Sequence, residues 1–122
     1  MSRARVAFGK IGEDLACGEL ERRGYAILAR RYRRRSGELD IVARDGPTIV
    51  FVEVKARGGR AFGEAAESVT AIKRRRMVHL ALDYLVHHRL TGRPCRFDVV
   101  SIHREGDRVR VEVYQNAFDV RW

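Results

Sequence analysis

The spacing of hydrophobic residues along the chain predicts two helices. Apolar residues recur at helical intervals between about Ala7 and Arg23, and Gly24 is a natural stop for this helix. A second apolar stripe of helical period runs from about Ser68 to Arg89. Basic residues crowd its first turns, so the pattern predicts an amphipathic helix that packs through its apolar stripe.

Five further segments have the residue types and alternation typical of β-strands. Tyr25–Leu28 begins a short strand, which leads into a run of arginines that ends at Ser36-Gly37. The other four form two predicted hairpins, Leu39–Arg44 with Ile49–Lys55, and Arg96–His103 with Arg108–Tyr114. This order indicates an α/β fold, with a mixed β-sheet flanked by helices, in a single domain over residues 1–122.

The first hairpin brings three charged side chains together. If Asp45-Gly46-Pro47-Thr48 is a four-residue loop, the register of the hairpin places Asp40 directly opposite Glu53. The Cβ atoms of residues opposed in this way lie roughly 5 Å apart. Because side chains alternate along a strand, Lys55 emerges on the same face as Glu53. The register therefore predicts a cluster of two carboxylates and one ammonium group.

The surroundings of Glu53 make this cluster costly to bury. Residues 49–54 read Ile-Val-Phe-Val-Glu-Val and are apolar on both faces, which is typical of a buried strand. Facing carboxylates in such a strand repel one another and lose hydration, and a divalent cation with oxygen ligands would compensate both costs. The alternative is a surface hairpin in which Glu53 and Lys55 form a weak ion pair and Asp40 faces water. Spacing alone does not decide between the two.

A family resemblance favours the metal site. Residues 37–46 (GELDIVARDG) and 50–57 (VFVEVKAR) resemble the central motif of the YraN-like family, bacterial proteins grouped with endonuclease-like folds. That family is similar in turn to archaeal Holliday-junction resolvases and RecB-type nucleases. Glu13 in the first helix, Lys73 in the second and Arg96-Phe97-Asp98-Val99-Val100 in a late strand also match it. The resemblance implies a restriction-endonuclease-like fold and a nuclease of the PD-(D/E)xK type.

The resemblance also implies catalytic roles for four residues of this chain. Asp40 and Glu53 would be ligands of Mg²⁺ or Mn²⁺. Lys55 would orient or activate the attacking water, and Glu13 would be a helix-borne acid near the same metal. The chain has only three lysines among its 25 basic residues. A lysine at position 55, where arginine would place its charge differently, therefore favours a chemical role.

The net charge of +9 and a pI near 10.5 would draw the protein toward a polyanion. Nucleic acid is the first candidate, and an anionic membrane surface is the second. Two basic runs lie on either side of the acidic hairpin in the sequence, and we favour phosphate contact over a merely solvated face for them. The predicted nucleic-acid-binding residues are Arg31, Arg33, Arg34, Arg35, Arg57, Lys73, Arg74, Arg75 and Arg76.

Other kinds of site find little support in the sequence. Cys17 and Cys95 stand far apart and belong to no C-x-x-C pair, which favours reduced thiols over a disulfide framework or a zinc ribbon. The four histidines lack a zinc-ligand spacing. No stretch approaches the roughly 18 consecutive apolar residues of a spanning helix, and the N-terminus lacks an apolar signal core. We therefore expect a cytoplasmic protein without a membrane partner.

Taken together, the residues and the resemblance predict a metal-dependent endonuclease that hydrolyses phosphodiester bonds of DNA, with branched or otherwise structured DNA as a candidate substrate. The resemblance to junction resolvases implies a homodimer as a further possibility. One alternative is a nucleic-acid-binding domain that keeps the nuclease fold but is catalytically silent. Another is a small basic RNA-associated protein in which Asp40, Glu53 and Lys55 are structural.

Overall fold

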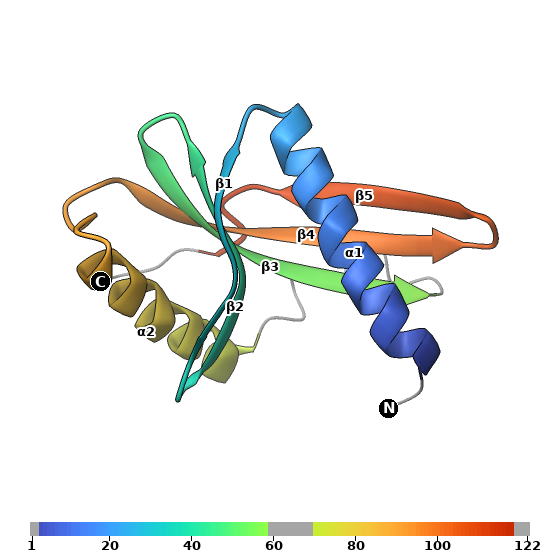
Figure 1. Cartoon of the computed structure of the whole chain (residues 1–122), viewed down its shortest axis with the longest axis horizontal. Coiled ribbons are helices and arrows are strands. Elements are labelled where there is room, and N and C mark those ends of the chain that lie inside the picture. The colour runs from blue at the N-terminus through green and yellow to red at the C-terminus, as the bar shows by residue number, and fades with distance from the viewer. Residues whose placement is uncertain (1–2, 59–69, 119–122) are drawn as a thin grey trace.

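The computed structural model describes residues 3–58 and 70–118, with side chains from residue 10 onward except those of residues 57 and 58. Within these residues five strands form one sheet in the order β1-β2-β3-β4-β5 (Figure 1). The strands are β1 (Ala26–Arg34), β2 (Gly37–Asp45), β3 (Thr48–Gly58), β4 (Cys95–Glu105) and β5 (Arg108–Tyr114). All neighbours are antiparallel except β3 and β4, which are parallel. The predicted α/β fold with a mixed sheet is confirmed.

One helix packs on each face of the sheet. On one face, α1 (Arg3–Arg22) contributes Ala16 and Leu20 to a buried cluster that includes Val50 and Val52 of β3. On the other face, α2 (Ala71–His87) contributes Met77, Leu80 and Tyr84 to a cluster that includes Phe51. The central strand β3 is therefore buried on both sides, as its continuous apolar sequence predicts.

The second helix begins later than its apolar pattern suggests. Thr70 has an extended backbone, and its side-chain Oγ1 accepts a hydrogen bond of 3.2 Å from the backbone N–H of Lys73. Thr70 is thus an N-cap, and α2 begins at Ala71 instead of Ser68, which lies outside the described residues. This cap fixes the backbone of the turn that carries Lys73.

The first strand is longer than the sequence pattern predicts. β1 continues through the run of arginines to Arg34, because its backbone pairs with β2 as far as Arg34 opposite Gly37. Arg35 and Ser36 alone form the turn into β2. The two strands extend together toward the beginning of α2 (Figure 1). The arginines that the sequence placed after a short strand therefore lie on a hairpin of defined geometry.

The hairpin of β2 and β3 has the predicted register with a shorter turn. Asp45 pairs with Thr48, so only Gly46 and Pro47 connect the strands, and Gly46 adopts a φ of 59°. Such a positive φ is readily available to glycine. Arg44 lies opposite Ile49, as predicted, and this register continues to Ile41 opposite Val52. The register from which Asp40 and Glu53 were predicted to be neighbours is confirmed.

Neither helix in the described part of the chain is long and apolar enough to cross a bilayer. Both cysteines are free thiols, with Cys17 buried on the sheet-facing side of α1 and Cys95 half-buried at the start of β4. Burial raises the pKa of each thiol. A raised pKa keeps a thiol protonated near neutral pH, which makes it a poor nucleophile.

Candidate active site

The candidate site begins where the pairing of β2 with β3 ends. Backbone pairing of the two strands reaches Ile41 and Val52, and beyond it the Asp40 carboxylate accepts a hydrogen bond of 2.8 Å at Oδ2 from the backbone N–H of Val54. The Asp40 side chain thus replaces a backbone acceptor. This contact holds its carboxylate beside β3, next to the position of Glu53.

Glu53 is the buried carboxylate of the cluster, with 6% of its surface exposed. Two ammonium groups reach its Oε1 atom. Lys55 Nζ, from the same strand, lies 3.5 Å away, and Lys73 Nζ, from the first turn of α2, makes a direct ion pair with it. The sequence predicted Lys55 at this position but placed Lys73 among the DNA-binding residues. The structure adds Lys73 to the carboxylate cluster.

The environment of the cluster shifts the pKa values of three of its members. Burial, followed by the charge of Glu53, raises the pKa of Asp40 from 3.8 to about 7. Burial, together with the neighbouring Lys73 ammonium, lowers the pKa of Lys55. Burial also opposes the charged form of Lys73, but hydrogen bonding to Glu53 contributes to a net rise in its pKa. The carboxylates therefore lie in a region where their negative charge is poorly solvated.

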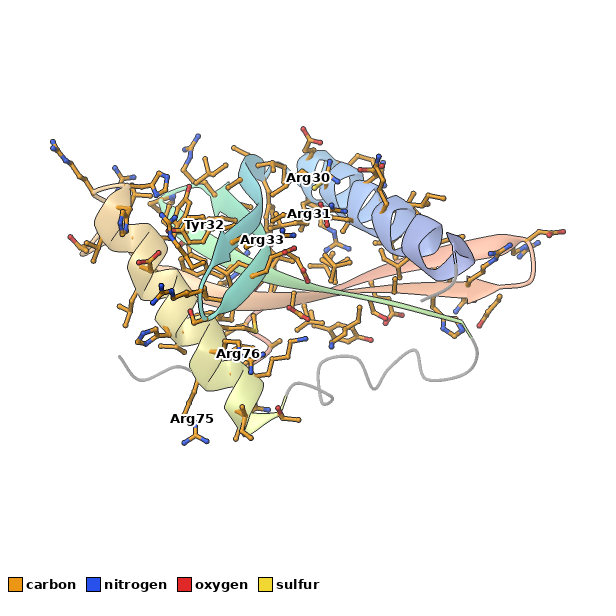
Figure 2. All side chains as sticks on the ribbon, turned by 60° about the horizontal axis from the view of Figure 1, so that its bottom comes forward. Arg30, Arg31, Tyr32, Arg33, Arg75 and Arg76 are labelled. Carbon is orange, nitrogen blue, oxygen red and sulfur yellow. The ribbon has the colours of Figure 1, made fainter. Side chains whose placement is uncertain are left out.

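Glu13 approaches the same region from α1 and is held by two consecutive arginines. Arg30 Nε donates a hydrogen bond of 3.0 Å to its Oε1, and Arg31 Nε donates one of 3.1 Å to its Oε2. Figure 2 shows both arginines between β1 and α1. The role of Glu13 as an acid of the site stays a prediction. Its carboxylate charge is neutralised by the two guanidinium groups in this arrangement.

A hollow of about 340 Å³ opens between these elements, and its lining residues are Glu13, Asp40, Val54, Lys55 and Ala56. A larger hollow of about 530 Å³ lies between the β1–β2 turn and α2. Its one carboxylate, Asp83, is paired with Arg34 at 2.8 Å. The smaller hollow is therefore the one that combines acidic groups with a lysine of lowered pKa, as hydrolytic sites often do.

The carboxylates at and next to the smaller hollow suit a hard divalent cation. In the described parts of the chain no three His, Cys, Asp or Glu side chains converge to form a metal cluster by themselves. Mg²⁺, however, commonly binds through one or two carboxylates and retains several waters. Asp40 and Glu53 could supply those carboxylates. The ion pair of Lys73 with Glu53 shows that a cation already compensates charge at this position.

Three of the predicted nucleic-acid-binding residues form ion pairs that join a helix to a strand. Arg31 binds Glu13, Arg34 binds Asp83, and Lys73 binds Glu53. Their remaining N–H groups are still partly accessible, since between 34% and 50% of each side chain is exposed. These residues therefore have structural contacts that the sequence did not reveal, and phosphate binding by them stays a prediction.

The other predicted nucleic-acid-binding residues lie mainly on the surface. Arg33 pairs with Glu38 at 3.0 Å but keeps 74% of its side chain exposed. Arg35, Arg75 and Arg76 are exposed, and Figure 2 shows Arg75 projecting from α2 away from the sheet. Arg74 is exposed and lies over the Phe118 ring at 5.3 Å, whereas the side chain of Arg57 lies outside the described residues.

The contacts of Lys73 and Arg30 were not predicted, and only that of Lys73 had a signal in the sequence. Lys73 is one of three lysines in an arginine-rich chain, and it follows the N-cap Thr70 by three residues. That combination could have marked it as a positioned ammonium group. Arg30 had no comparable signal, because regular alternation predicts that Arg30 and Arg31 point to opposite faces of the sheet.

Comparison with known proteins identifies a family. The model of "Uncharacterised protein family UPF0102" matches residues 12–102. A UPF0102 protein of Pelotomaculum thermopropionicum is 46% identical, covering 97% of this chain and 100% of the relative. UPF0102 protein STH1475 of Symbiobacterium thermophilum is 49% identical over 90% of this chain and 94% of the relative. A UPF0102 protein of Pseudomonas aeruginosa is 46% identical over 91% of each chain.

The similarity to solved structures is weaker. The structure of Pyrococcus furiosus SfsA in complex with Ca²⁺ aligns with 95% of this chain at a TM-score of 0.38 and 14% sequence identity. The aligned part spans 65% of that chain. A TM-score of this size does not establish a shared fold. The fold described above therefore rests on the strand order and on the helices that cover the sheet.

Proposed function

This chain belongs to the uncharacterised protein family UPF0102, and from the geometry of its site we propose that it is a Mg²⁺- or Mn²⁺-dependent nuclease acting on DNA. One observation carries the proposal. Asp40 and Glu53, on adjacent strands, form a poorly solvated carboxylate pair beside Lys55, and Asp40 and Lys55 line a hollow open to solvent. A purely structural ion pair would not need a second carboxylate whose pKa is raised to about 7.

The residues of the site have distinct roles in this proposal. Asp40 and Glu53 hold the divalent cation, which when bound stabilises charge on the phosphate oxygens and lowers the pKa of a water. Lys55 lines the hollow and carries a lowered pKa, so its amine can orient the attacking water or exchange a proton with it. Glu13, fixed by its two arginines, borders the same hollow.

The exposed arginines supply the proposed DNA-binding surface. Arg76 lies close to the β1–β2 turn, since a Cβ atom added at Gly37 would meet Arg76 Cδ at 2.9 Å. It is three residues beyond Lys73, and residues at that spacing share a helix face. Arg76 on α2 is thus a neighbour of the β1–β2 turn, in which Arg35 carries a second exposed guanidinium group. Such groups bind phosphates without sequence preference.

The substrate is proposed to be structured or branched DNA, on the strength of the resemblance to junction resolvases, and a homodimer is the corresponding assembly. Duplex, single-stranded, flapped and four-way DNA should therefore be offered in parallel, each with Mg²⁺, with Mn²⁺ and with chelator. We expect metal-dependent cleavage that is fastest on flapped or four-way DNA. Size-exclusion chromatography with light scattering measures the mass of the protein in the same buffer.

The assay compares two matched substitutions, each of which replaces a carboxylate by a neutral amide. Glu53→Gln removes a proposed ligand and should abolish cleavage. Glu21→Gln makes the same chemical change on the exposed surface of α1 and should leave cleavage unchanged. Binding without cleavage of any substrate under any metal condition would instead identify a catalytically silent DNA-binding domain. Equal cleavage by the two variants would show that Glu53 is not a ligand.

A further inference from the structure

We propose that Lys73 is the resident counter-ion of the site, and that a divalent cation must compete with its ammonium group for Glu53. The inference rests on the proposed metal-dependent function and assigns to Lys73 a positioning role in it. Its basis is the ion pair between Lys73 Nζ and Glu53 Oε1, which joins the first turn of α2 to the central strand of the sheet.

Lys73 is the closest cation to the buried carboxylate. Lys55 Nζ lies 3.5 Å from the same Oε1 atom, whereas Lys73 Nζ is in direct contact with it. Two ammonium groups thus converge on one oxygen, and they repel each other there. The arrangement compensates the buried charge of Glu53 in the metal-free protein at the cost of crowding two cations. A bound dication would add to that crowding, and Lys73 is the group best able to withdraw.

The position of Lys73 on its helix allows this withdrawal. The Thr70 cap fixes the backbone at Lys73, so α2 need not move. The side chain reaches Glu53 from an open position, with 34% of its surface exposed compared with 21% for Lys55. A lysine side chain has a flexible four-carbon stem that carries a compact charge. Rotation of this stem can release Glu53 while the ammonium stays at the edge of the hollow.

Competition between two cations for one carboxylate has a measurable consequence. Metal binding must break the Lys73–Glu53 ion pair, so the wild-type protein should bind metal more weakly than a variant without that ammonium group. Coupling of this kind typically changes an affinity about fivefold or more. The effect is opposite to that expected of a residue that helps to build the metal site, because loss of such a residue weakens binding.

The test measures metal affinity directly, without DNA. Isothermal titration calorimetry with Mn²⁺ and with Mg²⁺ compares wild type, Lys73→Met, Lys73→Arg and Arg75→Met at constant ionic strength. Arg75→Met is the matched control, because it removes one positive charge from the same helical turn but from a side chain that points away from the sheet (Figure 2). Lys73→Arg keeps the charge and controls for changes in packing.

We expect Lys73→Met to bind Mn²⁺ at least about fivefold more tightly than Arg75→Met. Lys73→Arg should bind no more tightly than wild type. In chelator, Lys73→Met should melt below Arg75→Met because Glu53 has lost its main counter-ion, and added Mn²⁺ should narrow or reverse that difference. Equal or weaker Mn²⁺ binding by Lys73→Met would overturn the inference, as would a lack of metal binding by every variant.

The cleavage assay distinguishes failure of the counter-ion role of Lys73 from failure of the proposed nuclease function. If Lys73→Met binds Mn²⁺ more tightly but wild type cleaves no DNA, the counter-ion role stands and the nuclease proposal fails. If wild type cleaves DNA with Mn²⁺ but Lys73→Met has unchanged metal affinity, the nuclease proposal stands and Lys73 is not a competing counter-ion.

Discussion

Arg31 Nε donates a hydrogen bond of 3.1 Å to Glu13 Oε2, and it does so from a backbone φ of 54°. In a regular strand, consecutive side chains point to opposite faces. Arg30 and Arg31 nevertheless both reach Glu13, and the left-handed conformation of Arg31 accounts for this break in alternation. Non-glycine residues adopt this conformation at a cost in free energy, and such strained residues are often found at functional sites.

The first prediction concerns this backbone conformation. Arg31→Ala and Arg31→Gly lose the same contact with Glu13, but only glycine adopts a φ of 54° without steric cost. We expect Arg31→Gly to be the more stable of the two by about 1 kcal/mol in urea unfolding. Arg33 lies on the same strand without a positive φ, so there Ala should be more stable than Gly. The same order at both positions would contradict the interpretation.

The second prediction separates chemistry from binding at Lys55. Lys55→Ala should reduce cleavage by about a hundredfold or more, because it removes the amine that lines the hollow. DNA affinity measured by fluorescence anisotropy should remain close to that of wild type, since one charge among many is lost. Lys10→Ala, which removes an exposed lysine from α1, is the control for charge. Unchanged turnover in Lys55→Ala would remove Lys55 from the mechanism.

The register of the β2–β3 hairpin was predictable because the turn between the strands specifies it. A slip by one residue would reverse every side chain, and the apolar residues of β3 alone would not prevent it because both faces of this strand are buried. The turn proved shorter than expected, but Arg44 and Ile49 still lie opposite each other, and the predicted register holds as far as Ile41 and Val52, the residues next to Asp40 and Glu53.

The contacts of Lys73 and Arg30 were not predictable from local patterns. The Lys73–Glu53 ion pair depends on how α2 is placed over the sheet, and helical periodicity indicates only which face is buried. The convergence of Arg30 and Arg31 on Glu13 depends on one residue with a positive φ inside a strand. No sequence rule places a left-handed arginine there, because arginine rarely adopts that conformation.

The third prediction concerns the DNA-binding surface. Affinity for DNA should fall steeply with salt, with a slope of log affinity against log salt of about −0.9 for each phosphate contact. Arg35→Ala combined with Arg76→Ala should weaken binding and make the slope shallower by about 2. Arg108→Ala combined with Arg110→Ala removes the same charge from exposed positions of β5, at the opposite edge of the sheet.

The Arg108→Ala and Arg110→Ala pair should change DNA affinity less and leave the salt slope close to its wild-type value. Anisotropy titrations at several salt concentrations, with one labelled duplex and one labelled four-way DNA, provide both quantities. Equal losses for the two double variants would indicate that binding follows net charge alone. In that case Arg35 and Arg76 would have no special role in DNA binding.

The last prediction follows from the raised pKa of Asp40 and concerns the metal-free protein. The pKa of Asp40 is about 7 in the folded protein and 3.8 for an ordinary aspartate. The folded state therefore holds this proton more tightly, and the associated stability is fully present below about pH 4 and is lost as pH rises through about 7. Asp40→Asn stays neutral at every pH and escapes this loss.

In chelator, the free energy of unfolding of Asp40→Asn relative to wild type should consequently increase between pH 5 and pH 8, by an amount on the order of a few kcal/mol at most. Urea unfolding at both pH values measures it. Asp14→Asn is the control. A hydrogen bond with Arg30 lowers the pKa of Asp14, so Asp14 is ionised at both pH values and the difference in stability from wild type should not change.

Added Mn²⁺ should reverse the stability advantage of Asp40→Asn at pH 8, since the cation stabilises wild type through the carboxylate that the variant lacks. If Asp40→Asn instead melts well below wild type in chelator at pH 8, and Mn²⁺ stabilises neither protein, then Asp40 is satisfied as a structural anion by the Val54 N–H and its neighbours, and it is not a metal ligand.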